Sequence, residues 1–230
     1  MSLKSNLIYK ASHTKWIEYP FYLYQKHIQG LFLKNTELSF FSNNCWMGIK
    51  CSEFGIRYNS PTVGMIIRPK DYLNFLLNPE QYLGQPIIDF GWDSEYDVLL
   101  GQIVPENPIY PPIRLDLVHY TSCEQATKDW LRRSPRVDFN NLLVKFSDRF
   151  LRSDEFSEMV SLFSDLNYKH KIFFTSRRNV KINNCKVIYC PEYVDDDSTR
   201  EWAFDKYHFN VVKLFNKVRS NFTFQNLYIV

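Results

Sequence analysis

Short apolar runs of strand length alternate along the chain with segments that repeat apolar residues at helical spacing, and this alternation constrains the fold most. The strand-like runs cover residues 37–41, 63–67, 86–90, 98–104, 113–119, 141–146, 171–175 and 186–189. Strands that alternate with amphipathic helices indicate a mostly parallel sheet with helices on both faces. We therefore expect an α/β fold, a Rossmann-like three-layer α/β/α arrangement. One sheet of it should contain residues 37–41, 115–118, 142–146 and 172–174.

Helix boundaries are marked by residues with known preferences at helix ends. A short helix should follow residue 45 and end at Gly55, and a second should begin at Pro69. Ser122 with Gln125 forms a capping-box pattern at the start of a third helix. Ser198 begins a fourth, which we expect to run through Phe209 to the C-terminal region.

The length and composition favour one domain. A chain of 230 residues is long enough for a substantial core and short enough for a single one. We find no repeat and no Gly/Ser linker, so we expect a single α/β domain over residues 1–230, with residues 1–35 packed on its core. Aromatic residues make up 17% of the chain, so rings should supply much of the buried apolar surface.

Several classes of protein are disfavoured by what the sequence lacks. No apolar stretch has the length of a membrane-spanning helix, and residues 1–24 lack the apolar core of a signal peptide. Five cysteines without a CxxC pair suggest free thiols, which fits a cytoplasmic protein. GxGxxG, P-loop, GxSxG and HExxH patterns are all missing. Aromatic and basic residues between positions 15 and 26 could form a peripheral membrane contact, although packing on the core is the simpler alternative.

Charge is unevenly distributed, with a basic segment at residues 128–152. The net charge of +3 gives no reason to expect a nucleic-acid partner. The basic segment is either solvated surface or a binding site for an anionic ligand such as a nucleotide diphosphate, a phosphate or a carboxylated sugar. Its candidate ligand-binding residues are Arg132, Arg133, Arg136 and Lys145. Helical spacing places Arg132 and Arg133 opposite the Trp130 face.

The turn after the first strand carries the candidate nucleophile. Asn43, Asn44 and Cys45 lie between strand 37–41 and the next helix, where ligands of open α/β sheets bind. A helix N-terminus would lower the pKa of the Cys45 thiol and activate it. The alternative is that Cys45 is structural or only lines a site, since free cysteines are often buried. Asn43 and Asn44 are candidate ligand-binding residues.

Three further candidates also follow predicted strands. His119 stands where an imidazole could act as a general base, or it could be a hydrogen-bonded structural histidine. Asp148 could orient a ligand hydroxyl or pair with a neighbouring arginine, and Ser122 could contact ligand at the start of its helix. Because parallel strands end at one edge, we expect Asn44, Cys45, His119 and Asp148 to converge on one cleft.

The run Asp195–Asp197 resembles the acidic motif that holds a divalent metal against a sugar nucleotide in some transferases. Three acids before a capped helix also suit the helix dipole and a solvated loop, which is the interpretation we favour. We therefore assign no metal ligand and expect no resident cofactor.

Motifs along most of the chain resemble one bacterial family. They include Ser42–Gly48 (SNNCWMG), Tyr58–Met65 (YNSPTVGM), His119–Ala126 (HYTSCEQA) and Leu143–Asp148 (LVKFSD). Together they are similar to a family of exopolysaccharide, or capsular polysaccharide, biosynthesis proteins with a domain of unknown function. The family has Gly-Gly where this chain has Met47-Gly48, and Phe-Asn-Asp where it has residues 146–148.

The resemblance implies a role in making a capsular or exported polysaccharide. The leading hypothesis is a glycosyltransferase-like transferase with a nucleotide-sugar donor, so that the partner is a sugar or a sugar nucleotide. An acyltransferase that modifies sugars is an alternative, because an Asn-Cys turn after a strand resembles acetyltransferases of other capsule pathways. A non-catalytic assembly partner is the third.

Overall fold

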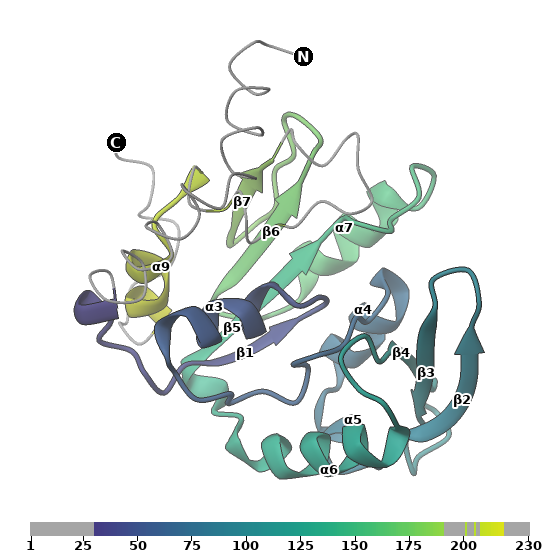
Figure 1. Ribbon diagram of the computed structural model, residues 1–230. Coiled ribbons are helices and arrows are strands. Elements are labelled where there is room, and N and C mark those ends of the chain that lie inside the picture. Colours follow the sequence, from purple (N-terminus) through teal and green to yellow (C-terminus); the bar gives the residue numbers. More distant parts are fainter. Residues whose placement is uncertain (1–29, 191–200, 202–204, 206–207, 219–230) are drawn as a thin grey trace.

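The computed structural model describes residues 30–190, 201, 205 and 208–218, and its centre is a four-stranded parallel sheet (Figure 1). The strands are β1 (Ser39–Ser42), β5 (Leu142–Ser147), β6 (Lys171–Thr175) and β7 (Cys185–Tyr189), in the order β1-β5-β6-β7. All neighbours pair in parallel, so their carboxyl ends lie along one edge. The predicted α/β fold with a mostly parallel sheet is confirmed.

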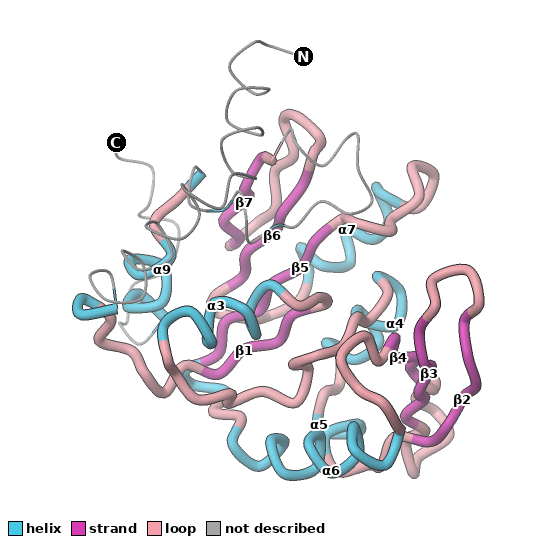
Figure 2. The backbone as a smooth tube through the Cα atoms, in the orientation of Figure 1, coloured by secondary structure: helices cyan, strands magenta, loops and turns pink. Residues whose placement is uncertain are grey.

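Helices cover both faces of this sheet, and the strands are buried between them (Figure 2). The helices α3 (Trp46–Phe54) and α9 (Val211–Val218) pack on one face, whereas α4 (Pro69–Leu77) and α7 (Phe156–Asp165) pack on the other. Successive side chains of a strand point to opposite faces. Phe40 therefore packs in the cluster of α3 and α9, while the ring centroid of Phe41 lies 4.8 Å from that of Phe75 in α4.

A second, antiparallel sheet stands beside the first and contains β2 (Ile88–Asp93), β3 (Val98–Ile103) and β4 (Ile113–Asp116). The prediction that residues 115–118 belong to the main sheet was wrong, because β4 pairs with β3. The half-buried alternation of that segment is typical of antiparallel sheets with one covered face, whereas β1, β5 and β6 are buried at every position.

The remaining helical elements lie before β1 or between the strands. They are α5 (Glu80–Leu83), α6 (Cys123–Arg133) and the 3₁₀ turns η2 (Gly30–Phe32), η3 (Ser134–Arg136) and η4 (Phe139–Asn141). The predicted start of α6 is confirmed, because Ser122 Oγ accepts a hydrogen bond of 3.2 Å from the Gln125 amide. None of the helices in the described part of the chain is both long and apolar enough to span a bilayer.

The C-terminal helix differs from the prediction at Phe209 and Asn210, which are not helical. Asn210 accepts a 2.8 Å hydrogen bond from the Lys213 amide, and this side-chain cap starts α9 as a separate helix. Of the predicted N-terminal segment, residues 1–29 lie outside the described residues, as does Asp195–Asp197. Within the described part, Asn35 donates to Asn141 Oδ1 at 2.8 Å and to the Phe215 carbonyl at 3.0 Å.

A buried lysine stabilises the end of α7. The ammonium group of Lys171, on β6, donates hydrogen bonds of 3.0, 2.7 and 2.8 Å to the carbonyls of Phe163, Ser164 and Leu166. The last carbonyls of a helix lack partners within the helix, and a cation there also interacts favourably with the helix dipole. Lys171 therefore joins α7 to the strand that follows it.

Replacing Lys171 with methionine should destabilise the protein by about 1–3 kcal/mol, because three carbonyls lose a charged donor while the apolar stem is kept. Urea unfolding followed by circular dichroism measures this loss. Lys169→Met, at an exposed position two residues earlier, is the matched control and should change the free energy of unfolding by less than about 0.5 kcal/mol. Equal effects in both variants would contradict a capping role.

Candidate functional site

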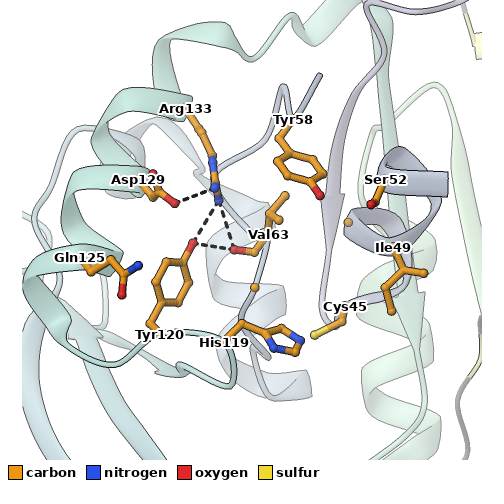
Figure 3. Close-up of a pocket in the computed structure, with 12 residues that line it drawn as sticks. Cys45, Ile49, Ser52, Tyr58, Val63, His119, Tyr120, Gln125, Asp129 and Arg133 are labelled. Atoms are coloured by element: carbon orange, nitrogen blue, oxygen red, sulfur yellow. Dashed lines mark hydrogen bonds and ion pairs between the residues drawn. The ribbon is translucent and has the colours of Figure 1, made fainter. Parts of the chain in front are cut away.

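A cavity of about 350 Å³ opens between α3 and α6, next to the carboxyl end of β1 (Figure 3). Helix α3 contributes Cys45, at its start, and Gly48, Ile49 and Ser52. Helix α6 contributes Gln125, Asp129 and Arg133, and loops contribute Tyr58, Val63, Gly64, His119 and Tyr120. The cavity therefore lies between α3, the helix that follows β1, and the segment that follows β4 of the antiparallel sheet.

Cys45 and His119 meet in this cavity although 74 positions separate them in the sequence. Figure 3 shows the imidazole of His119 directed toward the sulfur of Cys45. Cys45 is the N-cap residue of α3, and its carbonyl accepts a 3.0 Å hydrogen bond from the Ile49 amide. The His119 backbone is fixed by a 3.1 Å hydrogen bond from its amide to the Gly64 carbonyl. A thiol and an imidazole are thus presented to one cavity from two parts of the fold.

The acidity of Cys45 differs from the expectation for a helix N-terminus. Burial raises the pKa of the thiol to about 11, although the positive charges of Lys145 and Arg149 act in the opposite direction. The prediction of a lowered pKa was wrong because removal of the thiolate from water outweighs the favourable charges. At neutral pH the residue is a thiol, and a base must accept its proton before the sulfur can act as a nucleophile.

Arg133 forms the wall opposite α3 through three polar contacts of its terminal nitrogens. Its guanidinium donates to Tyr120 Oη at 3.0 Å, to the Val63 carbonyl at 3.3 Å and to Asp129 Oδ2 at 2.6 Å. Arg133 is only 7% exposed, so the predicted placement on the solvent side of α6 was wrong for this residue. The side chain turns back over the ring of Tyr58 toward the buried carbonyl of Val63.

The other predicted basic residues do not line the cavity. Arg132 is exposed and pairs with Asp129 at 2.6 Å, and Arg136 donates to the Tyr58 carbonyl at 3.4 Å. Lys145 is fully buried. Because the single carboxylate of Asp129 pairs with both Arg132 and Arg133, it offsets part of their positive charge, and the cavity is less basic than the sequence suggested.

Asn43, Asn44 and Lys145 form a buried network beneath the turn that carries Cys45. The Lys145 ammonium donates to Asn44 Oδ1 at 2.8 Å and contacts the carboxylate of Glu201. Asn44 in turn donates to Glu201 Oε1 at 2.9 Å and accepts from the Trp46 amide at 3.2 Å. The side chain of Asn43 joins the turn to β5, since it donates to the Ser147 carbonyl and accepts from the Ser147 amide. These contacts fix the turn and occupy the polar atoms that were predicted to face a ligand.

Asp148 lies at the same sheet edge but does not line the cavity. Its carboxylate accepts a 2.6 Å hydrogen bond from Thr175 Oγ1 and lies 4.0 Å from Arg177 Nε. Burial raises the pKa of this carboxyl to about 6, while the hydrogen bond from Thr175 opposes the shift. Of the four residues expected in one cleft, the structure therefore brings Cys45 and His119 together and leaves Asn44 and Asp148 in the buried layer.

Sequence reasoning missed nine of the twelve lining residues, five of which have polar side chains: Ser52, Tyr58, Tyr120, Gln125 and Asp129. The spacing of Gln125, Asp129 and Arg133 at intervals of four places them on one helical face, and this signal could have identified them. Tyr58 and Tyr120 lie in loops, whose course the local sequence does not specify. Ser122 caps α6 and is not among the residues that line the cavity. Within the described residues, no group of His, Cys, Asp and Glu side chains could hold a metal ion.

Gly64 sets the distance between the loop at 63–64 and the ring of Tyr120. Its φ of +84° lies in the region that favours glycine, and a Cβ here would stand 3.0 Å from the Tyr120 ring. Gly64→Ala should therefore cost backbone strain and also displace Tyr120. Gly55→Ala is a matched control, since Gly55 has φ +65° but open space around the same position.

We expect Gly55→Ala to lower the free energy of unfolding by about 1–2 kcal/mol from backbone strain alone. Gly64→Ala should lower it by at least about 1 kcal/mol more, because overpacking adds to the strain. Chemical denaturation of both variants measures the difference. Equal losses would show that Tyr120 moves aside freely and does not form a rigid wall.

Comparison with known proteins places this arrangement in a family. The profile described as "Domain of unknown function (DUF1919)" matches residues 22–222. A Haemophilus influenzae protein described as "Uncharacterized protein" is 28% identical over 146 residues, which cover 63% of this chain and 65% of that protein. The match thus spans slightly less than two thirds of the relative's length. Since the profile covers most of the sequence, the chain belongs to the DUF1919 family.

Proposed function

We propose that the chain is a transferase of cell-surface polysaccharide biosynthesis that moves an acyl group to a sugar hydroxyl. The observation that carries the reaction type is the pairing of the Cys45 thiol with the His119 imidazole in one cavity. A nucleophile beside a base is the arrangement that covalent acyl transfer requires. The biological setting rests on the resemblance of the motifs to exopolysaccharide biosynthesis proteins.

The first step transfers the acyl group to the enzyme. The Cys45 sulfur attacks the carbonyl carbon of a thioester donor while His119 accepts the thiol proton. The bond between the acyl carbon and the donor sulfur breaks, and the donor leaves as a thiol with the proton that His119 returns. The first amides of a helix lack partners within the helix, and in α3 the Trp46 amide donates to Asn44, which leaves those of Met47 and Gly48 suited to stabilise the negative charge on the carbonyl oxygen.

The second step transfers the acyl group to the sugar. His119 accepts the proton of a sugar hydroxyl as that oxygen attacks the acyl carbon of acylated Cys45. The sulfur leaves and regains the proton, so the thiol and the neutral imidazole are restored. The rings of Tyr58 and Tyr120 offer apolar faces for a sugar ring, and Ser52, Gln125 and Asp129 offer polar contacts. A cavity of about 350 Å³ is within the range typical of small-molecule sites.

A glycosyltransferase-like reaction with a nucleotide sugar is the second candidate. It is favoured by Arg177, whose partly exposed guanidinium lies beside Asp148 at the carboxyl edge of the parallel sheet. In that reaction His119 would be the base for the acceptor hydroxyl and Cys45 would only line the cavity. The pairing of Arg132 and Arg133 with Asp129 makes the cavity itself less suited to a diphosphate, and for this reason acyl transfer ranks first.

The reactivity of Cys45 should depend on pH as expected for a buried thiol. With a pKa of about 11, the thiolate fraction rises about tenfold for each pH unit between pH 7 and pH 9. The rate of Cys45 alkylation by iodoacetamide should follow this rise without a plateau. Peptide mass spectrometry separates Cys45 from the other four cysteines. A plateau near neutral pH would show that His119 and Cys45 form a stable ion pair in the resting protein.

The proposed reaction is tested by incubating the protein with acetyl-coenzyme A and a panel of monosaccharides. We expect one acetyl group on Cys45 and acetylated sugar in solution, and both should disappear in Cys45→Ala and Cys45→Ser. His119→Gln should slow turnover by about 10²–10⁴-fold because the general base is lost. Cys123→Ser is the control, since this partly buried thiol is not among the residues that line the cavity.

Two results would reject the acyl-transfer proposal. One is unchanged acetylation of the Cys45→Ala variant. The other is sugar transfer from a nucleotide sugar that survives in Cys45→Ala but fails in His119→Gln, which would favour the second candidate.

A further inference from the structure

The antiparallel sheet has an open edge at β2. This strand pairs with β3 on one side, and no described strand pairs with its other side. Figures 1 and 2 show the β2–β3 hairpin at the side of the molecule, away from the parallel sheet. An unpaired strand edge presents backbone amides and carbonyls that another extended segment can bind.

Large apolar side chains are exposed along this edge strand. Ile88, Phe90 and Trp92 are 51%, 50% and 59% exposed, and Tyr96 in the following turn is 48% exposed. β2 is the one strand of the described sheets whose residues are nearly all exposed. Clustered aromatic residues at the surface of a folded domain are a mark of an interaction site.

The charge around these side chains is negative. Residues 88–97 contain four acids and neither lysine nor arginine. Arg68 engages one of them, since it lies 3.4 Å from Asp93 and over the ring of Tyr96. Asp89, Glu95 and Asp97 form no ion pair with a described residue. An occupant of this edge must therefore supply positive charge as well as apolar side chains.

This negative charge makes the β2 edge a poor binding site for the β2 edge of a second copy of the chain. Pairing two β2 strands edge to edge would bring the acids of both copies together, and like charges opposite one another destabilise strand pairs. The strand also has a bulge between Asp89 and Gly91, where the Gly91 amide donates to Asp89 Oδ1 at 2.8 Å. Acidic side chains and bulges are devices that keep edges from self-pairing.

We propose that the β2 edge binds an extended, basic and apolar segment of a partner protein, which adds a strand to the antiparallel sheet. Backbone hydrogen bonds along the edge supply affinity, and side chains at alternate positions supply specificity in this mode of recognition. Lysines or arginines of the segment meet Asp89, Glu95 and Asp97, and its apolar residues cover Phe90 and Trp92. The inference is independent of the chemistry proposed for Cys45.

Fluorescence anisotropy with a labelled synthetic peptide of alternating lysine and valine tests the proposal. Two peptides are compared with it: one with glutamate in place of lysine, and one with every second backbone amide methylated. We expect binding of the first peptide to weaken with salt, and both comparison peptides to bind at least about tenfold more weakly. The methylated peptide keeps charge and side chains, so it isolates the contribution of strand pairing.

Variants then locate the site. The double variant Phe90→Ser/Trp92→Ser should lose the peptide, whereas Phe139→Ser, which removes an exposed aromatic side chain elsewhere, should retain it. Equal binding of the methylated or glutamate peptide, no detectable binding, or retained binding in the double variant would each overturn the proposal. So would concentration-dependent dimerisation, or binding to phospholipid vesicles, that the double variant abolishes. If that variant does not fold, the peptide comparison on the unaltered chain still decides the outcome.

Discussion

The buried ammonium group of Lys145 is the interaction on which the rest of the structure depends. A charge removed from water is strongly unfavourable unless it is paired and hydrogen-bonded, and Lys145 lies at the centre of the main sheet with no exposed surface. Its partners are Asn44, from the turn after β1, and Glu201, from the C-terminal part of the chain. Burial lowers the pKa of Lys145, and the nearby carboxylate of Glu201 counteracts this shift. The contacts that stabilise this one cation therefore fix three segments relative to one another: β5, the turn after β1 and the C-terminal part that contains Glu201.

The candidate site is built on that fixed turn. The side chain of Asn44 is hydrogen-bonded to Lys145 and Glu201, and it also accepts a hydrogen bond from the Trp46 amide in α3. Because Cys45 lies between Asn44 and Trp46, these contacts fix its position. A second buried pair, Lys50 with Asp205 at 2.8 Å, anchors α3 one turn later, and Asp205 also accepts from the indole of Trp46. His119 lies on the opposite side of the cavity, in the segment that follows β4. The Cys45 thiol and the His119 imidazole thus come from different parts of the fold, and the rigidity of each part determines their separation.

Much of the fold follows from local sequence, whereas the site depends on long-range contacts. The continuous apolar runs of β1, β5 and β6, the Gly55 terminus of α3 and the Ser122 cap of α6 are all short-range signals, and the structure has them. Local patterns do not show the sheet to which β4 belongs, because that depends on its pairing with β3. They also do not show the inward turn of Arg133 or the raised pKa of Cys45, because both depend on burial in the folded protein. Asn44 and Asp148 lie just past the ends of β1 and β5 as expected, but the buried contacts that fix them keep them out of the cavity.

The contact between Asn44 and Glu201 has a consequence for biosynthesis. The two residues are 157 positions apart, so the N-terminal partner leaves the ribosome long before the C-terminal one. At roughly 5–20 residues per second, the interval is roughly 8–30 seconds. Lys50 lacks Asp205 for almost all of this time, whereas Lys145 is made later and lacks Glu201 only while a further 56 residues are added. Until then the parallel sheet cannot bury either lysine at low cost. The apolar cluster between the parallel sheet and the helices α3 and α9 is therefore completed late, and holding chaperones have a defined window in which its aromatic side chains need protection.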